Sequence, residues 1–317
     1  MDLSIVISLF NEEESLPELL SRIKSTLGDN YKYEIILVDD GSTDSSWRVI
    51  LRQKELYPDT VKAIRFMRNY GKSAAIYCGF EAAQGNIVIT MDADLQDNPG
   101  EIPELYKMIS SGEWDLVSGW KKKRKDNVLT KNIPSRIYNY AARLVTGVRL
   151  HDMNCGLKAY RKEVIKNIEV YGEMHRYIPY IAKNAGFLRI GEKVVAHQSR
   201  KYGKSKFGMD RFFKGFLDLL SIWFLSRFGK RPMHFFGLIG TMTFLIGTGT
   251  SVWLIAEKIA SQAKGLPYRA VTDQPLFYIS LVALIIGMQL FLSGFIGEMI
   301  SRNSSERNNY KIRERIS

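Results

Sequence analysis

The stretch Ile87-Val88-Ile89-Thr90-Met91-Asp92-Ala93-Asp94-Leu95-Gln96 joins an apolar run directly to two carboxylates and an amide. Such a run predicts a buried strand, so the polar residues lie where that strand ends. Alternate residues of extended chain project to the same side, which lets Asp92, Asp94 and Gln96 converge on one point. Three oxygen donors at this spacing suit Mg²⁺ or Mn²⁺, and such a cation usually also holds phosphates. The alternative interpretation is a polar turn at the end of a strand.

The residues before this stretch repeat an alternation of strand and helix signals. Apolar runs predict strands at 3–10, 33–38, 61–66 and 86–91. A first helix is predicted to open at Asn11-Glu12-Glu13-Glu14-Ser15, a second to run through Leu56 and a third to span 73–84. The helix dipole favours acidic residues in such a first turn. The alternation predicts an α/β fold with a doubly wound, mostly parallel sheet that binds ligands at its carboxyl edge.

Two apolar segments near the C-terminus predict transmembrane helices. Residues 235–256 and 275–297 contain no charged side chain, and each is long enough to cross a bilayer core. A pair of buried helices in a soluble protein is the alternative interpretation. Nine Lys or Arg residues lie in 200–231 and five from Arg302 onward, against three in the loop 257–275. The positive-inside rule therefore predicts that both termini lie in the cytoplasm.

The segment that leads into the first span mixes charged and aromatic residues. Charges recur at roughly helical spacing among the phenylalanines, at Lys206, Asp210, Arg211, Lys214 and Asp218. This pattern predicts an amphipathic helix in the lipid headgroup layer, with a third span as the alternative. Small residues in the two spans predict close helix approach and a homo-oligomer; they are Gly240, Gly247, Gly249, Gly294 and Gly297.

Charge and cysteine content limit the functions to consider. The 317 residues carry a formal net charge of +12, which suits nucleic acid, anionic lipid or phosphorylated substrates. Cys78 and Cys155 have no partner at metal-binding spacing, so we expect reduced thiols in a cytosolic compartment and no zinc site. The chain begins as a strand without a basic region, and we therefore expect no signal peptide.

Five short motifs occur in an order that resembles a known enzyme family. They are Ile7-Ser8-Leu9-Phe10-Asn11-Glu12, Val38-Asp39-Asp40-Gly41-Ser42-Thr43-Asp44, Arg68-Asn69-Tyr70-Gly71-Lys72, Asp92-Ala93-Asp94-Leu95-Gln96 and Asn154-Cys155-Gly156-Leu157-Lys158. Together they resemble the family 2 inverting glycosyltransferases with the GT-A fold. Within that family they are similar to the polyprenyl-phosphate glycosyltransferases, such as dolichyl-phosphate mannose synthase and the bacterial bactoprenol-phosphate glucosyltransferases. Ser8 departs from the family, which usually has proline there.

The resemblance covers residues 3–230 by motif, and the two spans match the bacterial branch. It implies a cytoplasmic GT-A catalytic domain at 1–204 and amphipathic juxtamembrane helices at 205–231. Two transmembrane helices within 232–302 and a cytoplasmic tail at 303–317 would follow.

The resemblance also implies a role for each motif. The donor nucleotide would contact Ser8, Phe10, Glu12, Asp39, Asp40, Lys72, Asp92 and Ala93. The metal ion, Mg²⁺ or Mn²⁺, would be held by Asp92, Asp94 and Gln96, with Asp94 and Gln96 as the closest ligands. The acceptor phosphate would contact Lys131, Ser135, Arg200 and Lys204, and the catalytic residues would be Asp152 and Asp92.

Elementary chemistry limits what Asp152 has to do. A phosphate monoester has its second ionisation at about pH 6, so the acceptor oxygen is mostly deprotonated at neutral pH. A strong general base is then optional, and we expect Asp152 to orient the acceptor or a basic partner. The harder tasks are to bring two anions together and to stabilise the leaving diphosphate, which a metal ion with Lys and Arg groups can do. We expect His151 to be structural.

These observations favour an inverting, metal-dependent glycosyltransferase anchored in the inner membrane. It would move one sugar from a nucleotide-sugar, preferably UDP-glucose or a related UDP-sugar, to polyprenyl (undecaprenyl) phosphate at the cytoplasmic face. A GDP-mannose-dependent mannosyltransferase is one alternative. A processive polysaccharide synthase is another, although the Gln-x-x-Arg-Trp motif usual in those enzymes is absent. A non-catalytic membrane adaptor that binds lipid or nucleic acid would not need Asp92, Asp94 and Gln96, so we expect no nucleic acid partner.

Overall fold

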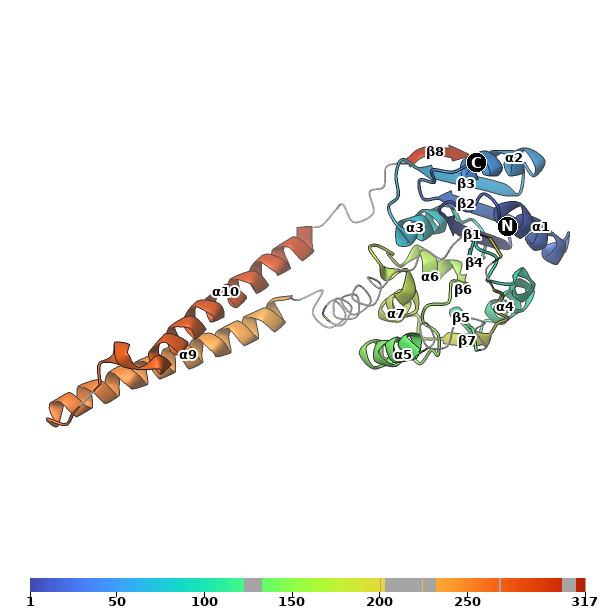
Figure 1. Cartoon of the computed structure of the whole chain (residues 1–317). Helices are drawn as coiled ribbons and strands as arrows, with labels where there is room; N and C mark the ends of the chain where they lie inside the picture. Colours follow the sequence, from blue (N-terminus) through green and yellow to red (C-terminus); the bar gives the residue numbers. More distant parts are fainter. Residues whose placement is uncertain are drawn as a thin grey trace. The chain divides into compact units, whose positions relative to one another are not determined.

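The computed structural model describes residues 1–122, 133–199, 201–202, 224, 232–267, 269–303 and 312–316. The chain divides into two compact units, which are described separately (Figure 1). The first comprises Met1–Leu219 together with Arg307–Ser317, and the second comprises Leu220–Glu306.

The first unit is built on a mixed, mostly parallel sheet. Within the described residues the sheet has eight strands in the order β7-β5-β6-β4-β1-β2-β3-β8. Its parallel centre consists of β1 (Leu3–Leu9), β2 (Tyr33–Asp39), β3 (Val61–Phe66) and β4 (Ile87–Asp92). β6 (Lys158–Arg161) runs antiparallel to both β4 and β5 (Leu116–Trp120), and β7 (Ile190–Val194) runs parallel to β5.

Helices cover both faces of this sheet, so the predicted doubly wound α/β fold is confirmed. Alternate residues of β1 face opposite sides, with Ile5 and Ile7 in one core and Val6 in the other. The first core is closed by α1 (Leu16–Leu27), α2 (Ser46–Leu56) and α4 (Ile102–Ser110). The second is closed by α3 (Lys72–Ala82), α6 (Lys162–Lys166) and α7 (Ile178–Asn184). The remaining elements of this unit are η1 (Pro99–Glu101), α5 (Ile133–Thr146) and η3 (Met174–Tyr177).

The start of the first helix differs from its prediction. Asn11 to Ser15 do not form a first helical turn, because α1 begins at Leu16. Asn11 has a φ of 56°, and its backbone N–H donates to Ser42 Oγ at 2.9 Å. The backbone N–H of Glu12 donates to Ser46 Oγ at 2.8 Å. The polar residues after β1 therefore join the neighbouring loop after β2, and these long-range bonds override the local helix signal.

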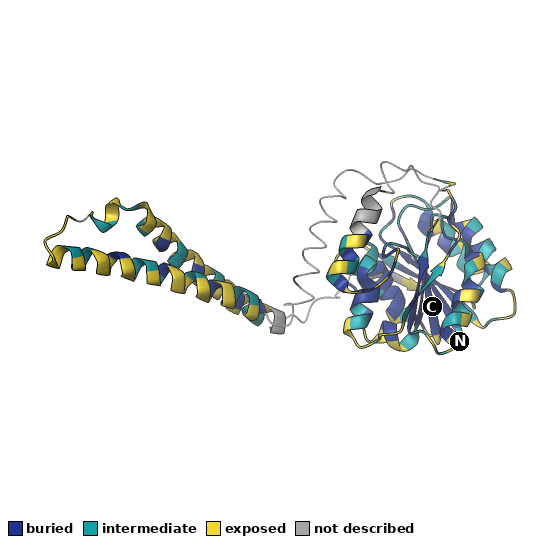
Figure 2. Ribbon diagram, turned by 90° about the horizontal axis from the view of Figure 1, so that it is seen from below, coloured by how far each residue is buried: buried dark blue, intermediate teal, exposed yellow. Residues whose placement is uncertain are grey.

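The second unit is a pair of long apolar helices, α9 (Pro232–Ala263) and α10 (Pro275–Asn303), with the short η4 (Val271–Asp273) between them. Each is long and apolar enough to cross a membrane, and only 17% of each apolar window is buried. Leu245 and Ile246 are more than 60% exposed, whereas Gly240 and Gly247 are buried (Figure 2). Helices in the core of a soluble protein would show the opposite pattern, which favours the membrane interpretation.

The glycines of these spans pack the two helices of one chain together. A Cβ at Gly240 would lie 2.6 Å from the backbone oxygen of Gly287, and one at Gly247 would lie 2.7 Å from that of Ser280. A Cβ at Gly249 would meet nothing within 4 Å. The predicted close helix approach is therefore confirmed for Gly240 and Gly247, and the helix that approaches them is α10 of the same chain. The homo-oligomer itself stays a prediction.

The C-terminal residues return to the first unit. β8 (Ile312–Ile316) pairs antiparallel with β3, with Ala63 opposite Ile316 and Arg65 opposite Glu314. Part of the expected tail at 303–317 thus supplies an edge strand of the sheet. Apart from Phe224, the predicted amphipathic region 205–231 lies outside the described residues.

Candidate active site

The register of the parallel strands brings the predicted polar clusters to one edge of the sheet. Ser8 on β1 lies opposite Asp92 on β4, and Leu9 lies opposite Asp39 on β2. All three strands end there, so the loops that follow them meet at their carboxyl ends. The sequence prediction that these groups share one crevice edge agrees with this register.

Asp39 and Asp40 are buried and hold the loops at this edge in place. Asp40 accepts backbone N–H groups from Tyr70 at 2.7 Å and from Gly71 at 3.0 Å. Asp39 accepts the Ser42 N–H at 2.8 Å. Burial raises the pKa of Asp40 to about 6 and also raises the pKa of Asp39. Both carboxylates bind backbone N–H groups, so they shape the crevice that was predicted to receive the nucleotide, while Asp39 Oδ2 lies 3.5 Å from Arg65 Nε and accepts no hydrogen bond among the described residues.

The turn after Asp40 requires glycine. Gly41 has a φ of 73°, in the left-handed region that side chains with a Cβ rarely adopt. A Cβ there would also lie 2.4 Å from the carbonyl carbon of Arg68. The loops after β2 and β3 therefore touch at this point.

Phe10 and Glu12 follow β1 on the same edge and are both half-buried. The Glu12 carboxylate accepts the Ser15 hydroxyl at 3.1 Å, just before α1 begins. Glu12 thus binds the residue that precedes α1. The nucleotide contact predicted for Glu12 stays a prediction.

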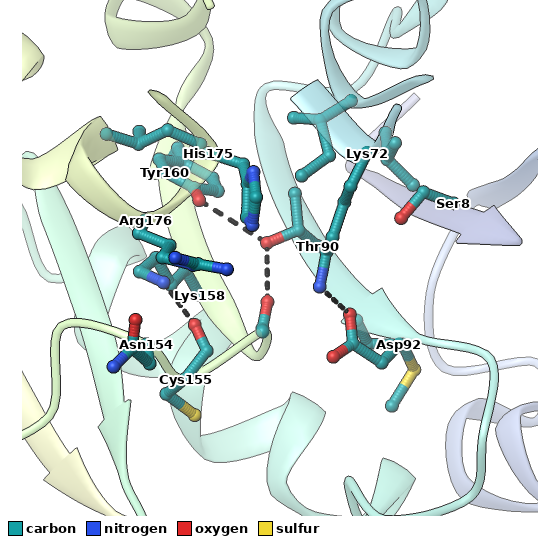
Figure 3. Close-up of a pocket in the computed structure, with 15 residues that line it drawn as sticks. Ser8, Lys72, Thr90, Asp92, Asn154, Cys155, Lys158, Tyr160, His175 and Arg176 are labelled. Atoms are coloured by element: carbon teal, nitrogen blue, oxygen red, sulfur yellow. Dashed lines mark hydrogen bonds and ion pairs between the residues drawn. The ribbon is translucent and has the colours of Figure 1, made fainter. Parts of the chain in front are cut away.

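Asp92 lies in a pocket whose walls come from β1, β4 and β6, from α3 and η3, and from the loop 154–156 (Figure 3). Its carboxylate forms an ion pair with the ammonium of Lys72, the first residue of α3. Gly156 packs directly against it, because a Cβ at Gly156 would lie 2.6 Å from each atom of the carboxylate group. The pocket is lined by Val6, Ser8, Lys72, Ile76, Thr90, Met91, Asp92, Asn154, Cys155, Gly156, Lys158, Tyr160, His175, Arg176 and Ile178.

The charge of Asp92 is fixed by its surroundings. Burial alone would raise the pKa of this carboxyl, but the positive charges of Lys72 and Lys121 outweigh it and hold the pKa below its usual range. Asp92 is therefore ionised at neutral pH. An ionised carboxylate beside a lysine and a glycine can bind a cation or orient a polar ligand.

Lys121 and Asp97 form a second charge pair behind Asp92. Lys121 Nζ lies 2.7 Å from Asp97 Oδ1, and Asp97 Oδ2 accepts the backbone N–H of Asp92 at 3.3 Å. Both side chains are almost fully buried. Lys121 belongs to the basic run 121–125, and its own partner is this buried carboxylate.

Asp94 and Gln96 are half-buried in the turn that follows β4. Leu95 between them has a φ of 61°, and Asp94 Oδ1 accepts the Gln96 N–H at 3.1 Å. Neither residue lines the pocket around Asp92. The structure thus keeps them close in one turn, while Asp92 faces the pocket and Ala93 is buried.

The turn after β4 carries oxygen donors of the kind that Mg²⁺ binds. No group of three His, Cys, Asp or Glu side chains with the geometry to hold a metal occurs in the part of the chain that the structure describes. Mg²⁺ characteristically uses one or two carboxylates plus substrate phosphates rather than a cage made by the protein alone. Asp92 and Asp94, with the amide of Gln96, supply such an incomplete set of hard oxygen donors.

Asp152 is buried but does not line the pocket. Its Oδ1 accepts the Asn154 N–H at 3.2 Å, and its own N–H donates to Glu192 at 3.1 Å. These bonds fix the start of the loop that carries Asn154 and Gly156. His151 stacks on Trp120 and binds Glu192, in line with the structural role expected for it.

Two further bonds hold that loop, one from β4 and one from β6. Thr90 Oγ1 donates to the Gly156 carbonyl at 2.9 Å, and Lys158 Nζ donates to the Cys155 carbonyl. Lys158 is 3% exposed, and burial together with the charge of Lys72 lowers its pKa. Lys158 belongs to a quoted motif, but sequence reasoning assigned no role to it.

Sequence reasoning also missed three residues of the pocket wall. Tyr160 comes from β6, whereas His175 and Arg176 come from η3, about 80 residues after β4 along the chain. No local pattern links His175-Arg176 to the Asp92 motif. Only the packing of η3 against α3 brings them together, through the bonds between Ser73 and His175.

Most of the residues predicted to bind the acceptor phosphate lie outside the described part of the chain. Lys131, Arg200 and Lys204 lie outside the described residues. Ser135 lies on α5, but its side chain is not part of the description.

Comparison with known proteins places this site in a family. Residues 4–169 match the family model described as "Glycosyl transferase family 2". The chain is 37% identical to the dodecaprenyl-phosphate galacturonate synthase of Rhizobium johnstonii, over 95% of this chain and 88% of that protein. It is 35% identical to the undecaprenyl-phosphate 4-deoxy-4-formamido-L-arabinose transferase of Pseudomonas aeruginosa, over 96% and 86% of the two chains.

Solved structures agree on the fold. Glucosyl-3-phosphoglycerate synthase from Mycobacterium tuberculosis superimposes with a TM-score of 0.55 at 20% identity, over 72% of this chain and 80% of that one. The same enzyme in complex with Mn²⁺, UDP-glucose and phosphoglyceric acid gives a TM-score of 0.52 at 21% identity, over 71% and 79% of the two chains. The family match, the relatives and the pocket at the carboxyl edge together show that this chain belongs to glycosyl transferase family 2, among its polyprenyl-phosphate glycosyltransferases.

Proposed function

We propose that this protein transfers a single sugar from a nucleotide-sugar to a polyprenyl phosphate. The observation that carries the proposal is the ionised Asp92, held between Lys72 and Gly156 at the edge where the loops after β1, β2 and β4 meet. Two relatives that share a third or more of their residues with nearly the whole chain are named for sugar transfer to polyprenyl phosphates. Their names support the same acceptor class here.

The pocket's charges suit the approach of two anions. Lys72, Lys158 and Arg176 supply positive charge around Asp92, and positive groups stabilise charge that develops on a leaving diphosphate. The acceptor phosphate is mostly ionised at neutral pH, so the reaction needs orientation more than proton removal. Asp152 serves this need by fixing the loop that presents Asn154 and Gly156 to the pocket.

A divalent cation is part of the proposal. Asp92, Asp94 and Gln96 would hold Mg²⁺ or Mn²⁺, which neutralises the donor diphosphate when bound. A structural neighbour crystallised with Mn²⁺ and UDP-glucose supports the ion and the preference for a UDP-sugar. We further propose direct displacement at the sugar carbon, which inverts its configuration.

In this proposal the first unit is the catalytic unit, and it would lie at the cytoplasmic face of the inner membrane. Segments on both sides of the α9–α10 hairpin belong to the catalytic unit, so both ends of the hairpin connect to the same side of the membrane. The basic flanks of the hairpin support the cytoplasmic side.

A transfer assay tests the proposal directly. Membranes containing the full-length protein are incubated with undecaprenyl phosphate and, in separate reactions, UDP-glucose, UDP-galacturonate or GDP-mannose, and the lipid product is analysed by mass spectrometry. We expect a monoglycosyl lipid phosphate from a UDP-sugar, and its loss in excess EDTA. A product with several sugars would indicate a processive synthase, and full activity in EDTA would contradict the metal assignment.

A further inference from the structure

One polar atom of the pocket has no hydrogen-bond partner in the part of the chain that the structure describes. The side-chain oxygen Oδ1 of Asn154 is buried, and no hydrogen bond satisfies it among the described residues. The backbone N–H of the same residue is already bound by Asp152. A buried carbonyl oxygen without a donor is costly, and native structures rarely leave one in that state without a reason. Asn154 lines the pocket around Asp92, so a ligand in that pocket is a suitable partner.

The chemistry of this atom limits what that partner can be. An amide oxygen only accepts hydrogen bonds, whereas phosphate dianions and carboxylates offer acceptors and no protons. Neither group can satisfy Asn154 Oδ1. The nearby Lys158 ammonium donates to the Cys155 carbonyl. A hydroxyl group donates one hydrogen bond and accepts others, which makes a sugar hydroxyl a matching partner.

His175 adds a second neutral hydrogen-bonding group to the same pocket. Its ring nitrogen Nδ1 lies 3.0 Å from Ser73 Oγ, and its backbone N–H donates to the same oxygen at 3.0 Å. These two bonds fix the ring and leave Nε2 as the nitrogen available to a ligand. Burial, with the positive charges of Lys72 and Arg176, holds the pKa of His175 well below its usual range. The ring is therefore neutral, which suits a hydroxyl better than an anion.

The positions of these groups match the order of the parts of a nucleotide-sugar. Asp92 and Lys72 form one side of the pocket, where the proposed metal and the diphosphate would lie. Asn154 lies on the other side in the close-up, with His175 above the space between them (Figure 3). The sugar is attached to the outer phosphate of the donor, so with the diphosphate beside Asp92 it would extend toward Asn154.

We propose that Asn154 and His175 form the subsite that binds hydroxyl groups of the donor sugar and so determine which sugar is transferred. The inference rests on the proposed function, because it assumes that the pocket receives a nucleotide-sugar. It concerns two residues that contribute no charge, in contrast to the lysines and arginine that surround them.

A comparison of the affinities for a UDP-sugar and for UDP separates contacts to the sugar from contacts to the nucleotide. The dissociation constants of the full-length protein in detergent are measured for UDP, UDP-glucose and UDP-galacturonate. Asn154→Ala removes one hydrogen bond to the sugar, so we expect the affinity for the preferred UDP-sugar to fall about tenfold. The affinity for UDP stays unchanged. Asn184→Ala, at an exposed residue that ends α7, is the matched control and changes neither constant.

Two further measurements distinguish a sugar contact from a purely structural role. His175→Gln keeps a nitrogen near the place of Nε2 and retains most of the affinity for the UDP-sugar, whereas His175→Phe loses it. In a series of monodeoxy UDP-sugar analogues, one analogue binds the wild type and Asn154→Ala equally, because its missing hydroxyl is the one that Asn154 contacts.

Equal weakening of UDP and UDP-sugar by Asn154→Ala, or no change in either, would overturn the subsite. A wild type that binds the UDP-sugars no better than UDP would overturn it as well. Failure of the wild type to bind UDP at all would contradict the proposed donor class itself, and the subsite with it.

Discussion

The catalytic unit and the helical hairpin use their buried space in opposite ways. In the catalytic unit most large apolar side chains are buried, and buried charges such as Asp97 and Lys121 are paired. In the hairpin most of the surface is exposed (Figure 2), including the large apolar residues, and glycines such as Gly247 occupy the contact between helices. The difference shows two solvents at work, because water excludes apolar surface and lipid does not.

The two units also differ in what their closely packed glycines contact. In the catalytic unit a glycine leaves room for a carboxylate, since Gly156 packs on Asp92. In the hairpin a glycine leaves room for backbone, since Gly247 packs on the Ser280 carbonyl. The same residue type thus serves chemistry in one unit and helix packing in the other.

The sharpest test removes the charge on which the catalytic unit depends. Asp92→Asn keeps the shape of the side chain but loses the ion pair with Lys72 and the charge needed for a cation. We expect transfer to fall by about 10²–10³-fold, as when one electrostatic contact to developing charge is lost. The measurement is the initial rate of lipid product formation in membranes.

Asp59→Asn, at an exposed residue that precedes β3 and so lies at the other end of that strand from the active-site loops, serves as the control and leaves the rate unchanged. A rate for Asp92→Asn within twofold of the wild type would remove Asp92 from the active site.

The second test concerns the free energy needed to bury the charge of Asp40 in the catalytic unit. The apolar spans 235–256 and 275–297 of the hairpin contain no charged side chain. Burial raises the pKa of Asp40 to about 6, above its value in the unfolded chain. The stability that follows is fully present below the unfolded pKa of about 4 and is lost as pH rises through 6. The difference amounts to about 3 kcal/mol between pH 4 and pH 7.

Thermal unfolding in detergent at several pH values checks this linkage. Asp40→Asn does not titrate, so its stability relative to wild type should improve steadily from pH 4 to pH 7. A relative stability that is constant over this range would show that Asp40 has an ordinary pKa.

The third test addresses the hairpin. A Cβ at Gly247 would lie 2.7 Å from the Ser280 carbonyl oxygen and 2.9 Å from the Leu284 nitrogen, so α9 and α10 must separate to accept it. We expect Gly247→Ala to destabilise the hairpin by about 2 kcal/mol, the usual range for overpacking. Gly249→Ala is the control, because its Cβ meets nothing within 4 Å.

Thermal unfolding of both variants in the same detergent measures the difference. Equal unfolding temperatures for the two variants would mean that the helices do not pack through Gly247.

The smallest effect is expected where a glycine serves chemistry. Gly156→Ala would place a Cβ 2.6 Å from the Asp92 carboxylate, whose flexible end can move aside. We therefore expect a rate loss of about tenfold from misplacement, with little change in the unfolding temperature. Gly100→Ala, whose Cβ would meet only the Asn98 side chain at 3.3 Å, is the matched control. A large loss of stability in Gly156→Ala with a normal rate would reverse the contrast between the two units.

Much of the fold could be predicted because its signals are local. The strand from 61 to 66 appears as expected, and the strands of the parallel centre end within a residue of their predicted limits. Apolar runs bounded by turn residues leave little choice for such strands. The exception is the start of α1, where Ser42 and Ser46 from the next loop bind the residues predicted to be helical.

In the active site, too, local patterns could be predicted from the sequence and long-range contacts could not. The sequence by itself determined the Asp92 motif, the Asp39-Asp40 loop and the two apolar spans, because each is a short pattern whose physical meaning does not depend on distant residues. Only the tertiary structure decided that Lys72 pairs with Asp92, that Lys121 is buried with Asp97, and that His175 joins the pocket. It also decided that residues 312–316 complete the sheet and that Gly240 and Gly247 pack helices within one chain. These contacts join residues that are far apart in the sequence, and they form only when the surfaces of different elements pack together. The spacing of residues within one segment therefore does not predict them.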